Sequence, residues 1–430
     1  MRPMRVCMLS VHTCPLATLG GKETGGMNVY VRDLTRELSR RGVLVDVFTR
    51  SQDPCRQHVV SDRLGAHGRV IHVKAGPEAP YDKQRLPELL PEFTANVERF
   101  AADAGIHYDV IHSHYWLSGL VAIELRQRWG APFVQMFHTL GHMKNSVAQR
   151  PEELESERRL QGEAEVMRQA DAIVAATPLE KAQMSWLYGA EPAKITVIPC
   201  GVDLEQFHPI PRAEAKACLG LPQRQRMILF VGRIEALKGI DTLLRAIALL
   251  VARRPEWQSQ LSVIILGGNP HLPVEQLDAE MARLHALRAE LGISDVVTFR
   301  GASAQETLPA YYSAAEMVIV PSHYESFGMV ALEAMACGTP VIATKVGGLA
   351  YTVQDGVTGF HIPCRDYEAL AERMERILSD RALQEQLGRQ AAEWAGQYSW
   401  SRIAEQILCA YRQVLRPCRL EALSLAADAG

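Results

Sequence analysis

The sequence predicts an α/β protein made of two doubly wound parallel-sheet domains. With 430 residues, the chain is longer than one ordinary domain. Near the N-terminus an apolar strand at 5–10 is followed by a glycine-containing loop, an amphipathic helix at 27–41 and a second strand at 43–49, which together form one βαβ unit. The same succession begins again at 227, with a strand at 227–231 and a helix at 241–253. This restart indicates a second domain of the same class.

The remaining elements fill in the two domains. Further first-domain strands are predicted at 110–113, 133–137, 172–175 and 195–199, and second-domain strands at 261–266, 296–299, 317–320 and 340–343. Residues 208–225 contain three prolines and are predicted to be a linker, and Asp241 is predicted to cap the following helix. We therefore expect domains at 1–207 and 208–405, and a final helix at 406–430 that packs back on the first domain.

Two such domains place a cleft between them, lined by the carboxyl ends of both sheets. Ligands of open α/β sheets bind at those ends. We therefore expect the functional residues in the loops that follow the strands.

Composition narrows the classes of function and the compartment. Lys plus Arg number 46 against 49 for Asp plus Glu, so the net charge of −3 argues against a general nucleic-acid binder. The nine cysteines are scattered without a CxxC pair, which favours free thiols in a reducing compartment. The first residues do not resemble an export signal, and no apolar run reaches the length of a membrane span. We therefore expect a cytoplasmic protein.

The loop 232–239 follows a predicted strand and carries Arg233 and Lys238. Arginine presents a planar fork to phosphate oxygens and lysine a point charge, so the two can converge on one anion. Beside a departing diphosphate they would stabilise the developing negative charge. The alternative is a solvated loop with two ordinary surface cations.

The segment 321–340 carries two carboxylates around a predicted helix start. Glu325 lies in the loop, the helix is expected to begin near Phe327, and Glu333 lies within it. Free amides at a helix N-terminus suit phosphate or sugar oxygens, and carboxylates accept paired hydrogen bonds from neighbouring hydroxyls. The alternative is that Glu333 pairs structurally and Glu325 is solvated.

These two motifs, in this order and spacing, resemble those of the retaining glycosyltransferases of family 4, which have the GT-B fold. The resemblance extends over nearly the whole chain. It implies that Arg233 and Lys238 grip the donor diphosphate and that Glu333 holds the nucleotide ribose. It also implies that the transferred sugar is contacted by Glu325 and by backbone amides, which belong here to Phe327, Gly328 and Met329.

In the first half, Gly25 and Gly26 lie at the start of the predicted helix 27–41. Glycines at a helix N-terminus allow close approach of a ligand, and the helix dipole favours an anion, so Gly26 is a candidate donor-binding residue. A structural turn is the alternative. His138 follows a strand and matches a family histidine near the transferred sugar, which implies that it hydrogen-bonds the donor rather than acting as a nucleophile.

Within the family, the first half is most similar to the subfamily of mycothiol synthesis that glycosylates inositol 3-phosphate. The resemblance implies that Lys83, Tyr115, Thr139 and Arg159 hold the acceptor phosphate, and that His12 and Asn28 contact the inositol. Two cations and two hydroxyls are chemically suited to a phosphate. This sequence departs from the subfamily where Cys14 replaces a serine and where the loop 18–24 differs, with Glu23 in place of an aspartate.

The resemblance implies transfer from UDP-N-acetylglucosamine or UDP-glucose with retention of anomeric configuration. Arg233, Lys238, Glu325 and His138 are the candidate catalytic residues. We expect no metal and no cofactor, because cations and helix N-termini take the place of a divalent ion and the donor loops contain no DxD-type acidic pair.

Several alternatives remain open at the level of the sequence. The acceptor can instead be a sugar phosphate or a lipid-linked sugar. Arg412, Arg416 and Arg419 lie among apolar residues, so the last helix either contacts an anionic membrane or simply packs on the protein. A UDP-sugar epimerase and a non-catalytic nucleotide-sugar sensor are the remaining alternatives.

Overall fold

The computed structural model describes residues 2–18, 24–269 and 278–427, with side chains described as far as residue 415. These residues form two compact units. Of the described residues, the first unit comprises 2–17, 26–200 and 400–427, and the second comprises 18, 24–25 and those within 201–399. The chain thus passes between the units at residues 17–18, 25–26, 200–201 and 399–400; the boundaries expected from the sequence were 207–208 and 405–406. Val202 forms a bridge with Ser399, which joins the two ends of the second unit.

The first unit contains an eight-stranded sheet in the order β3-β4-β2-β1-β5-β6-β7-β8. Every pairing is parallel except that of β3 with β4. The strands are β1 (Arg5–Leu9), β2 (Leu44–Arg50), β3 (Val59–Val60), β4 (Gly68–Val73), β5 (Val110–His114), β6 (Phe133–Met136), β7 (Ala172–Ala175) and β8 (Ile195–Val197). Strands β3 and β4 were not expected from the sequence, because alternating polar residues around them mask the apolar pattern.

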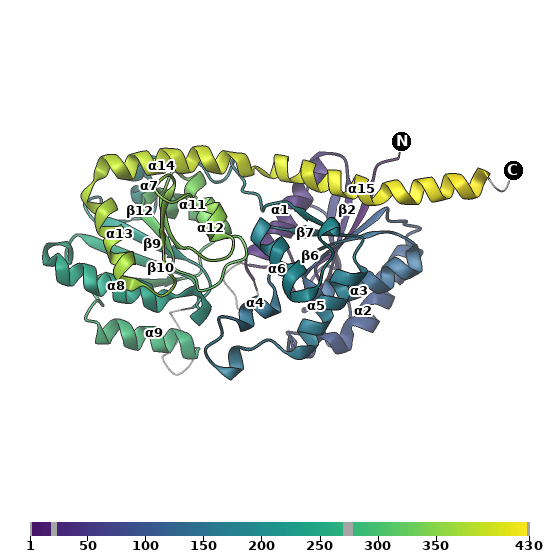
Figure 1. The fold of residues 1–430 in the computed structure, drawn as a ribbon, viewed down its shortest axis with the longest axis horizontal. Coiled ribbons are helices and arrows are strands. Elements are labelled where there is room, and N and C mark those ends of the chain that lie inside the picture. Colours follow the sequence, from purple (N-terminus) through teal and green to yellow (C-terminus); the bar gives the residue numbers. More distant parts are fainter. Residues whose placement is uncertain (1, 19–23, 270–277, 428–430) are drawn as a thin grey trace. The chain divides into compact units, whose positions relative to one another are not determined.

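Helices cover both faces of this sheet (Figure 1). They are α1 (Gly26–Arg40), α2 (Leu90–Asp103), α3 (Tyr115–Trp129), α4 (Gly141–Asn145), α5 (Glu157–Gln169), α6 (Pro178–Tyr188) and α15 (Trp400–Ala427), with short 3₁₀ turns η1 (Leu86–Leu89), η2 (Pro151–Glu153) and η3 (Pro192–Lys194). The last helix, α15, packs on α1, and the Trp400 ring meets the Tyr30 ring edge-on with centroids 5.2 Å apart.

The second unit contains a six-stranded, entirely parallel sheet in the order β11-β10-β9-β12-β13-β14. Its strands are β9 (Arg226–Val231), β10 (Leu261–Leu266), β11 (Val297–Gly301), β12 (Ala315–Val320), β13 (Val341–Thr344) and β14 (Gly359–Ile362). Its helices are α7 (Arg212–Cys218), α8 (Ile240–Arg253), α9 (Ala279–Glu290), α10 (Leu308–Ala314), α11 (Met329–Ala336), α12 (Leu349–Thr352), α13 (Tyr367–Ser379) and α14 (Arg381–Ala395), with 3₁₀ turns η4 (Ala236–Lys238), η5 (Pro255–Trp257), η7 (Gln305–Thr307) and η8 (Gly396–Tyr398).

In the second unit two local expectations were wrong and one strand was not predicted. The expected linker contains helix α7, whose Ala215 is buried, so burial outweighs the prolines around it. Asp241 does not cap α8, because the helix begins one residue earlier and Gly239 takes the capping position in a left-handed conformation. Strand β14 was missed, because its glycine and histidine hide its apolar character.

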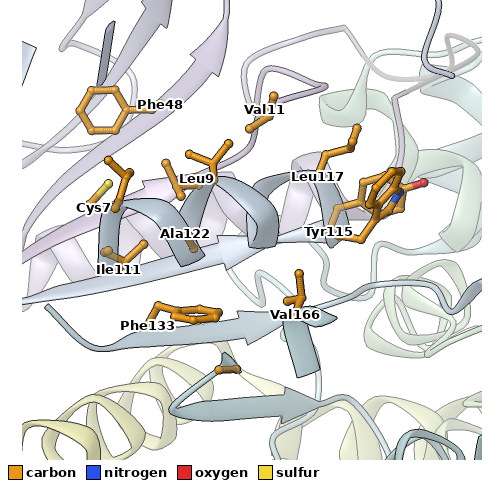
Figure 2. Close-up of a cluster of buried hydrophobic side chains, with 14 of the residues drawn as sticks. Cys7, Leu9, Val11, Phe48, Ile111, Tyr115, Leu117, Ala122, Phe133 and Val166 are labelled. Atoms are coloured by element: carbon orange, nitrogen blue, oxygen red, sulfur yellow. The ribbon is translucent and has the colours of Figure 1, made fainter. Parts of the chain in front are cut away.

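The core of the first unit lies between the strands of its sheet and the helices that cover them. Leu9 of β1 and Phe133 of β6 are fully buried together with Leu117 and Ala122 of α3 (Figure 2). A parallel sheet with helices on both faces has no solvent-facing side, so the side chains of its inner strands are buried whether they are apolar or polar. Strand β5 in the middle of the sheet is mixed in this way: Ile111 is apolar, His112 and Ser113 are polar, and all three are fully buried.

Candidate active site

In the second unit, the loops that follow the adjacent strands β9 and β12 lie against each other. The amide of His323 donates to the carbonyl of Leu237 at 2.8 Å. Gly239 has φ +65°, and a Cβ at this position would lie 2.1 Å from the carbonyl oxygen of Pro321. Only glycine permits this approach, which holds the loop of Lys238 next to the loop of Glu325.

Lys238 and Glu325 form an ion pair. The Nζ of Lys238 lies 2.6 Å from Oε2 of Glu325, and each side chain is 19% exposed. Arg233 pairs with Glu235 at 2.8 Å and is more exposed. The structure therefore joins one predicted diphosphate-binding cation directly to the predicted sugar-binding carboxylate.

The backbone around Glu325 is held by the loop after β13, through two glycines that the sequence reasoning did not single out. The Gly348 amide donates to the carbonyl of Glu325 at 2.8 Å. A Cβ on Gly347 would lie 1.9 Å from the same carbonyl oxygen, and one on Gly348 would lie 2.3 Å from Cα of Phe327. The signal available in the sequence was a pair of glycines shortly after a predicted strand.

Helix α11 begins at Met329, two residues after the expected start near Phe327. Gly328 precedes it with φ +94°, so the chain turns sharply before the helix. Glu333 is buried one turn into this helix, and its Oε2 accepts a hydrogen bond from the Tyr312 hydroxyl at 2.8 Å. Tyr312, on α10, was missed because nothing in its local sequence distinguishes it from a core tyrosine.

In the first unit, four predicted acceptor residues gather around Tyr115. The Nζ of Lys83 lies 4.8 Å from the Tyr115 ring centroid, and Cζ of Arg159 lies 4.9 Å from it. The His12 ring lies 4.5 Å from it, centroid to centroid. Thr139 joins the cluster through Arg159, whose Nη2 donates to Oγ1 of Thr139 at 3.0 Å. Cations over an aromatic face are attracted by its electron-rich surface, so this ring keeps two positive groups at one place.

Asn28 lies beside the loop that carries His12. Its Nδ2 donates to Oγ1 of Thr13 at 2.7 Å and to the carbonyl of Cys14 at 2.8 Å. Burial and, secondarily, the neighbouring cations Lys83 and Arg159 lower the pKa of His12 well below its usual value. His12 is therefore a neutral hydrogen-bonding group at neutral pH.

His138 follows β6 with φ +62°, a conformation rare for a residue with a side chain. Its Nε2 lies 3.0 Å from Nδ1 of His114, and the Tyr30 ring meets it edge-on at 5.2 Å. Burial lowers the pKa of His138 to about 3. The neutral state agrees with the expected hydrogen-bonding role, which stays a prediction.

Gly26 is the first residue of α1, and its donor-binding role also stays a prediction. Glu23 lies outside the described residues, as do the side chains of Arg416 and Arg419. Among the residues that the structure describes, no group of three or more His, Cys, Asp or Glu side chains is placed to hold a metal ion. Within that same part of the chain, no helix is both long and apolar enough to cross a bilayer.

The two units match two known family descriptions. Residues 24–206 match the family described as Glycosyltransferase Family 4, and residues 211–394 match Glycosyl transferases group 1. Together with two parallel-sheet α/β units, these matches define an enzyme of the glycosyltransferase class with the GT-B fold.

The chain belongs to glycosyltransferase family 4. It is similar to the D-inositol 3-phosphate glycosyltransferase of Saccharomonospora viridis, with 42% identity over 99% of this chain and 97% of that protein. The protein of the same name from Actinosynnema mirum is 44% identical over 95% of this chain and 97% of its own length.

Solved structures with the same fold include one with substantial sequence similarity. The sucrose-phosphate synthase of Thermosynechococcus elongatus has a TM-score of 0.87 and 38% identity, covering 96% of this chain and 100% of its own. Anabaena HepE in complex with UDP and glucose has a TM-score of 0.74 over 95% of this chain and 100% of its own. At 22% identity, HepE shows similarity of fold alone.

Proposed function

We propose that this enzyme transfers a sugar from a UDP-sugar, UDP-N-acetylglucosamine or UDP-glucose, to a phosphorylated polyol such as inositol 3-phosphate. The observation that carries the acceptor is the gathering of Lys83, Arg159 and Thr139 around Tyr115. Two cations and a hydroxyl at one place suit a phosphate dianion, and the relatives named above are D-inositol 3-phosphate glycosyltransferases.

Donor binding is assigned to the second unit. The Lys238 ammonium is available to a diphosphate once it exchanges Glu325 for the ligand, and the freed carboxylate can accept hydrogen bonds from sugar hydroxyls. The buried Glu333 carboxylate, held by Tyr312, suits the vicinal hydroxyls of a ribose. Arg233 supplies a second cation for the diphosphate.

The proposed reaction retains the anomeric configuration. The acceptor hydroxyl attacks the anomeric carbon from the side of the leaving group, while the bond from that carbon to the phosphate oxygen breaks. The electron pair passes to the phosphate oxygen, which takes the proton of the acceptor hydroxyl, so the products are the glycoside and the nucleoside diphosphate. Lys238 and Arg233 stabilise the charge that develops on the phosphate, and no metal is required on this proposal.

We also propose that the enzyme works in the cytoplasm. The cysteines whose side chains the structure describes, including Cys14 and Cys55, are free thiols, as expected in a reducing compartment.

A second candidate acceptor is a sugar phosphate. The similarity to a protein named sucrose-phosphate synthase, at 38% identity over 96% of this chain, favours it. The cluster around Tyr115 suits the phosphate of either acceptor. Discrimination between the two acceptors therefore depends on contacts to the polyol or sugar part.

A donor-by-acceptor screen read by mass spectrometry tests the proposal. The donors are UDP-N-acetylglucosamine, UDP-glucose and their ADP and GDP counterparts; the acceptors are inositol 3-phosphate, inositol and fructose 6-phosphate. We expect transfer to inositol 3-phosphate and at least a hundredfold less to inositol, because about 3 kcal/mol is typical for lost charge-assisted hydrogen bonds. Equal transfer to inositol would contradict the proposal. Free sugar without an acceptor would indicate an epimerase, and donor binding without turnover a sensor.

A further inference from the structure

Every nitrogen of the Arg159 guanidinium is already occupied. Its Nε donates to Oε1 of Glu163 at 2.7 Å, and its Nη2 donates to the carbonyl and Oγ1 of Thr139, both at 3.0 Å. Its Nη1 lies 2.8 Å from Oε1 of Glu155. The Arg159 side chain is only 3% exposed, so a phosphate can reach the guanidinium nitrogens only by replacing one of these partners.

Glu163 is a permanent partner. It is completely buried on α5, one turn after Arg159, and its Oε2 accepts the Gly141 amide at 2.9 Å. The Tyr188 hydroxyl donates to the same oxygen. Displacing Glu163 would leave the buried Gly141 amide without its acceptor, which costs about 1–3 kcal/mol, and would also take the partner from the half-buried Tyr188 hydroxyl. Glu163 therefore holds the orientation of Arg159 in both the free and the liganded enzyme.

Glu155 differs from Glu163 in each of these respects. It lies in the connection before α5, and its side chain is 22% exposed. It also has a second partner, because Nζ of Lys144, itself 31% exposed, contacts the same carboxylate oxygen. Glu155 can thus leave Arg159 and remain paired with Lys144. Because water reaches Glu155, its carboxylate loses less on leaving Arg159 than the fully buried Glu163 would.

Lys83 supplies the other half of the cluster. Its ammonium lies over the Tyr115 ring. No carboxylate of the described residues lies within ion-pair distance of Lys83. A phosphate can therefore bind Lys83 directly and complete its contacts by taking Nη1 of Arg159.

We infer that Glu155 is an exchangeable occupant of the phosphate site, which the acceptor phosphate displaces from Arg159, whereas Glu163 is a positioning residue that holds Arg159 throughout. The inference rests on the proposed function. A phosphate dianion brings two charges and several acceptor oxygens in exchange for one carboxylate, so exchange is favourable for it. A monoanion or an uncharged polyol gains nothing over Glu155, so the exchange selects for the dianion.

Calorimetry with inorganic phosphate and with inositol 3-phosphate tests the inference at about pH 7.5, where phosphates are mainly dianionic. Glu155→Gln removes the competing charge and is expected to tighten binding of both probes roughly threefold to tenfold. Glu163→Gln removes the charge that orients Arg159 and is expected to weaken binding roughly tenfold. Tyr188→Phe removes only a hydrogen bond to Glu163 and is expected to weaken binding less.

Glu152→Gln is the matched control, because Glu152 is an exposed carboxylate shortly before Glu155 that pairs with Arg150 rather than with Arg159. It should leave both affinities within about twofold. Unchanged or weaker phosphate binding in Glu155→Gln overturns the inference, and so does equal tightening in Glu152→Gln. Should the wild type bind neither probe, the proposed acceptor site fails as well, so the two failures are distinguishable.

Discussion

The Nζ of Lys238 lies 2.6 Å from Oε2 of Glu325, although the two residues follow different strands and are far apart in the sequence. Each residue has a proposed partner in the donor, the diphosphate for Lys238 and the transferred sugar for Glu325. In the absence of donor they neutralise each other. On the proposed function, the donor must separate this ion pair before either residue can bind it.

Replacing Lys238 with alanine tests the diphosphate role. We expect Lys238→Ala to lower kcat/KM by about 10²–10³, because removal of one group that stabilises developing charge typically costs 2.7–4 kcal/mol. The measurement is steady-state turnover with the donor and acceptor that the screen identifies.

Arg245→Ala is the control for the loss of one positive charge, because Arg245 is an exposed residue of α8. Its turnover should stay at the wild-type level. Turnover of Lys238→Ala within threefold of the wild type would contradict the assignment of Lys238 to the donor diphosphate.

Tyr312→Phe tests whether Tyr312 positions Glu333. The substitution removes the hydroxyl that donates to Oε2 of Glu333 and keeps the ring. We expect the KM for the donor to rise roughly fivefold, at a cost of about 1 kcal/mol for one hydrogen bond, with little change in the KM for the acceptor.

A control variant distinguishes a positioning role of Tyr312 from a general loss of stability. Tyr311, the neighbouring residue on α10, has a hydroxyl that lies at the edge of hydrogen-bond distance from Arg300 rather than near Glu333. Tyr311→Phe should leave both KM values unchanged. An equal rise in donor KM for both variants would show that Tyr312 acts through general destabilisation.

Lys83→Ala tests the phosphate site in the first unit. We expect the KM for inositol 3-phosphate to rise at least tenfold with the donor KM nearly unchanged, because the lost hydrogen bond to a charged group is worth about 1.5–3 kcal/mol. Lys74→Ala, at an exposed lysine earlier in the same region, is the control. A rise in donor KM of the same size would place Lys83 elsewhere than at the acceptor.

His112 gives the stability a pH dependence. It is fully buried, its Nδ1 lies 2.7 Å from the Tyr411 hydroxyl, and burial lowers its pKa to about 3. Between about pH 6.5 and pH 3 the unfolded chain binds a proton at this residue that the folded chain does not, so stability falls as the pH falls. The loss from one such group is about 1.4 kcal/mol for each pH unit.

Chemical denaturation at several pH values measures this slope. We expect His112→Asn to be less stable than the wild type at neutral pH. Between pH 6.5 and pH 4.5 its unfolding free energy should fall less steeply with pH, by a slope that corresponds to about one proton taken up on unfolding. His67→Asn, at an exposed histidine, should keep the wild-type slope. If the unfolding free energies of His112→Asn and the wild type change with pH at the same rate, the pH dependence does not come from His112.

Chelation tests the expectation that no metal takes part. We expect dialysis against EDTA to leave turnover within twofold of the untreated enzyme, because Lys238 and Arg233 are proposed to supply the positive charge. Loss of turnover that added Mg²⁺ or Mn²⁺ restores would overturn this expectation.

The sequence by itself determined the class of fold and indicated the loops that carry the candidate site. Apolar strands with helices between them have a period and a length that local composition reveals, so strands such as 172–175 and 261–266 were predicted with their observed bounds. Arg233, Lys238, Glu325 and Glu333 were found because each lies in a short motif next to a strand.

Only the tertiary structure decided which partners these residues have. Tyr312 donates a hydrogen bond to Glu333, and Tyr411 contacts His112. Glu155 and Glu163 each form an ion pair with a different nitrogen of Arg159. Such pairs form where strands, helices and loops distant in sequence pack together, and no local period or spacing encodes which side chain will face which. The physical reason is that burial requires each polar group to find a partner, while the chain path alone decides which partner is within reach.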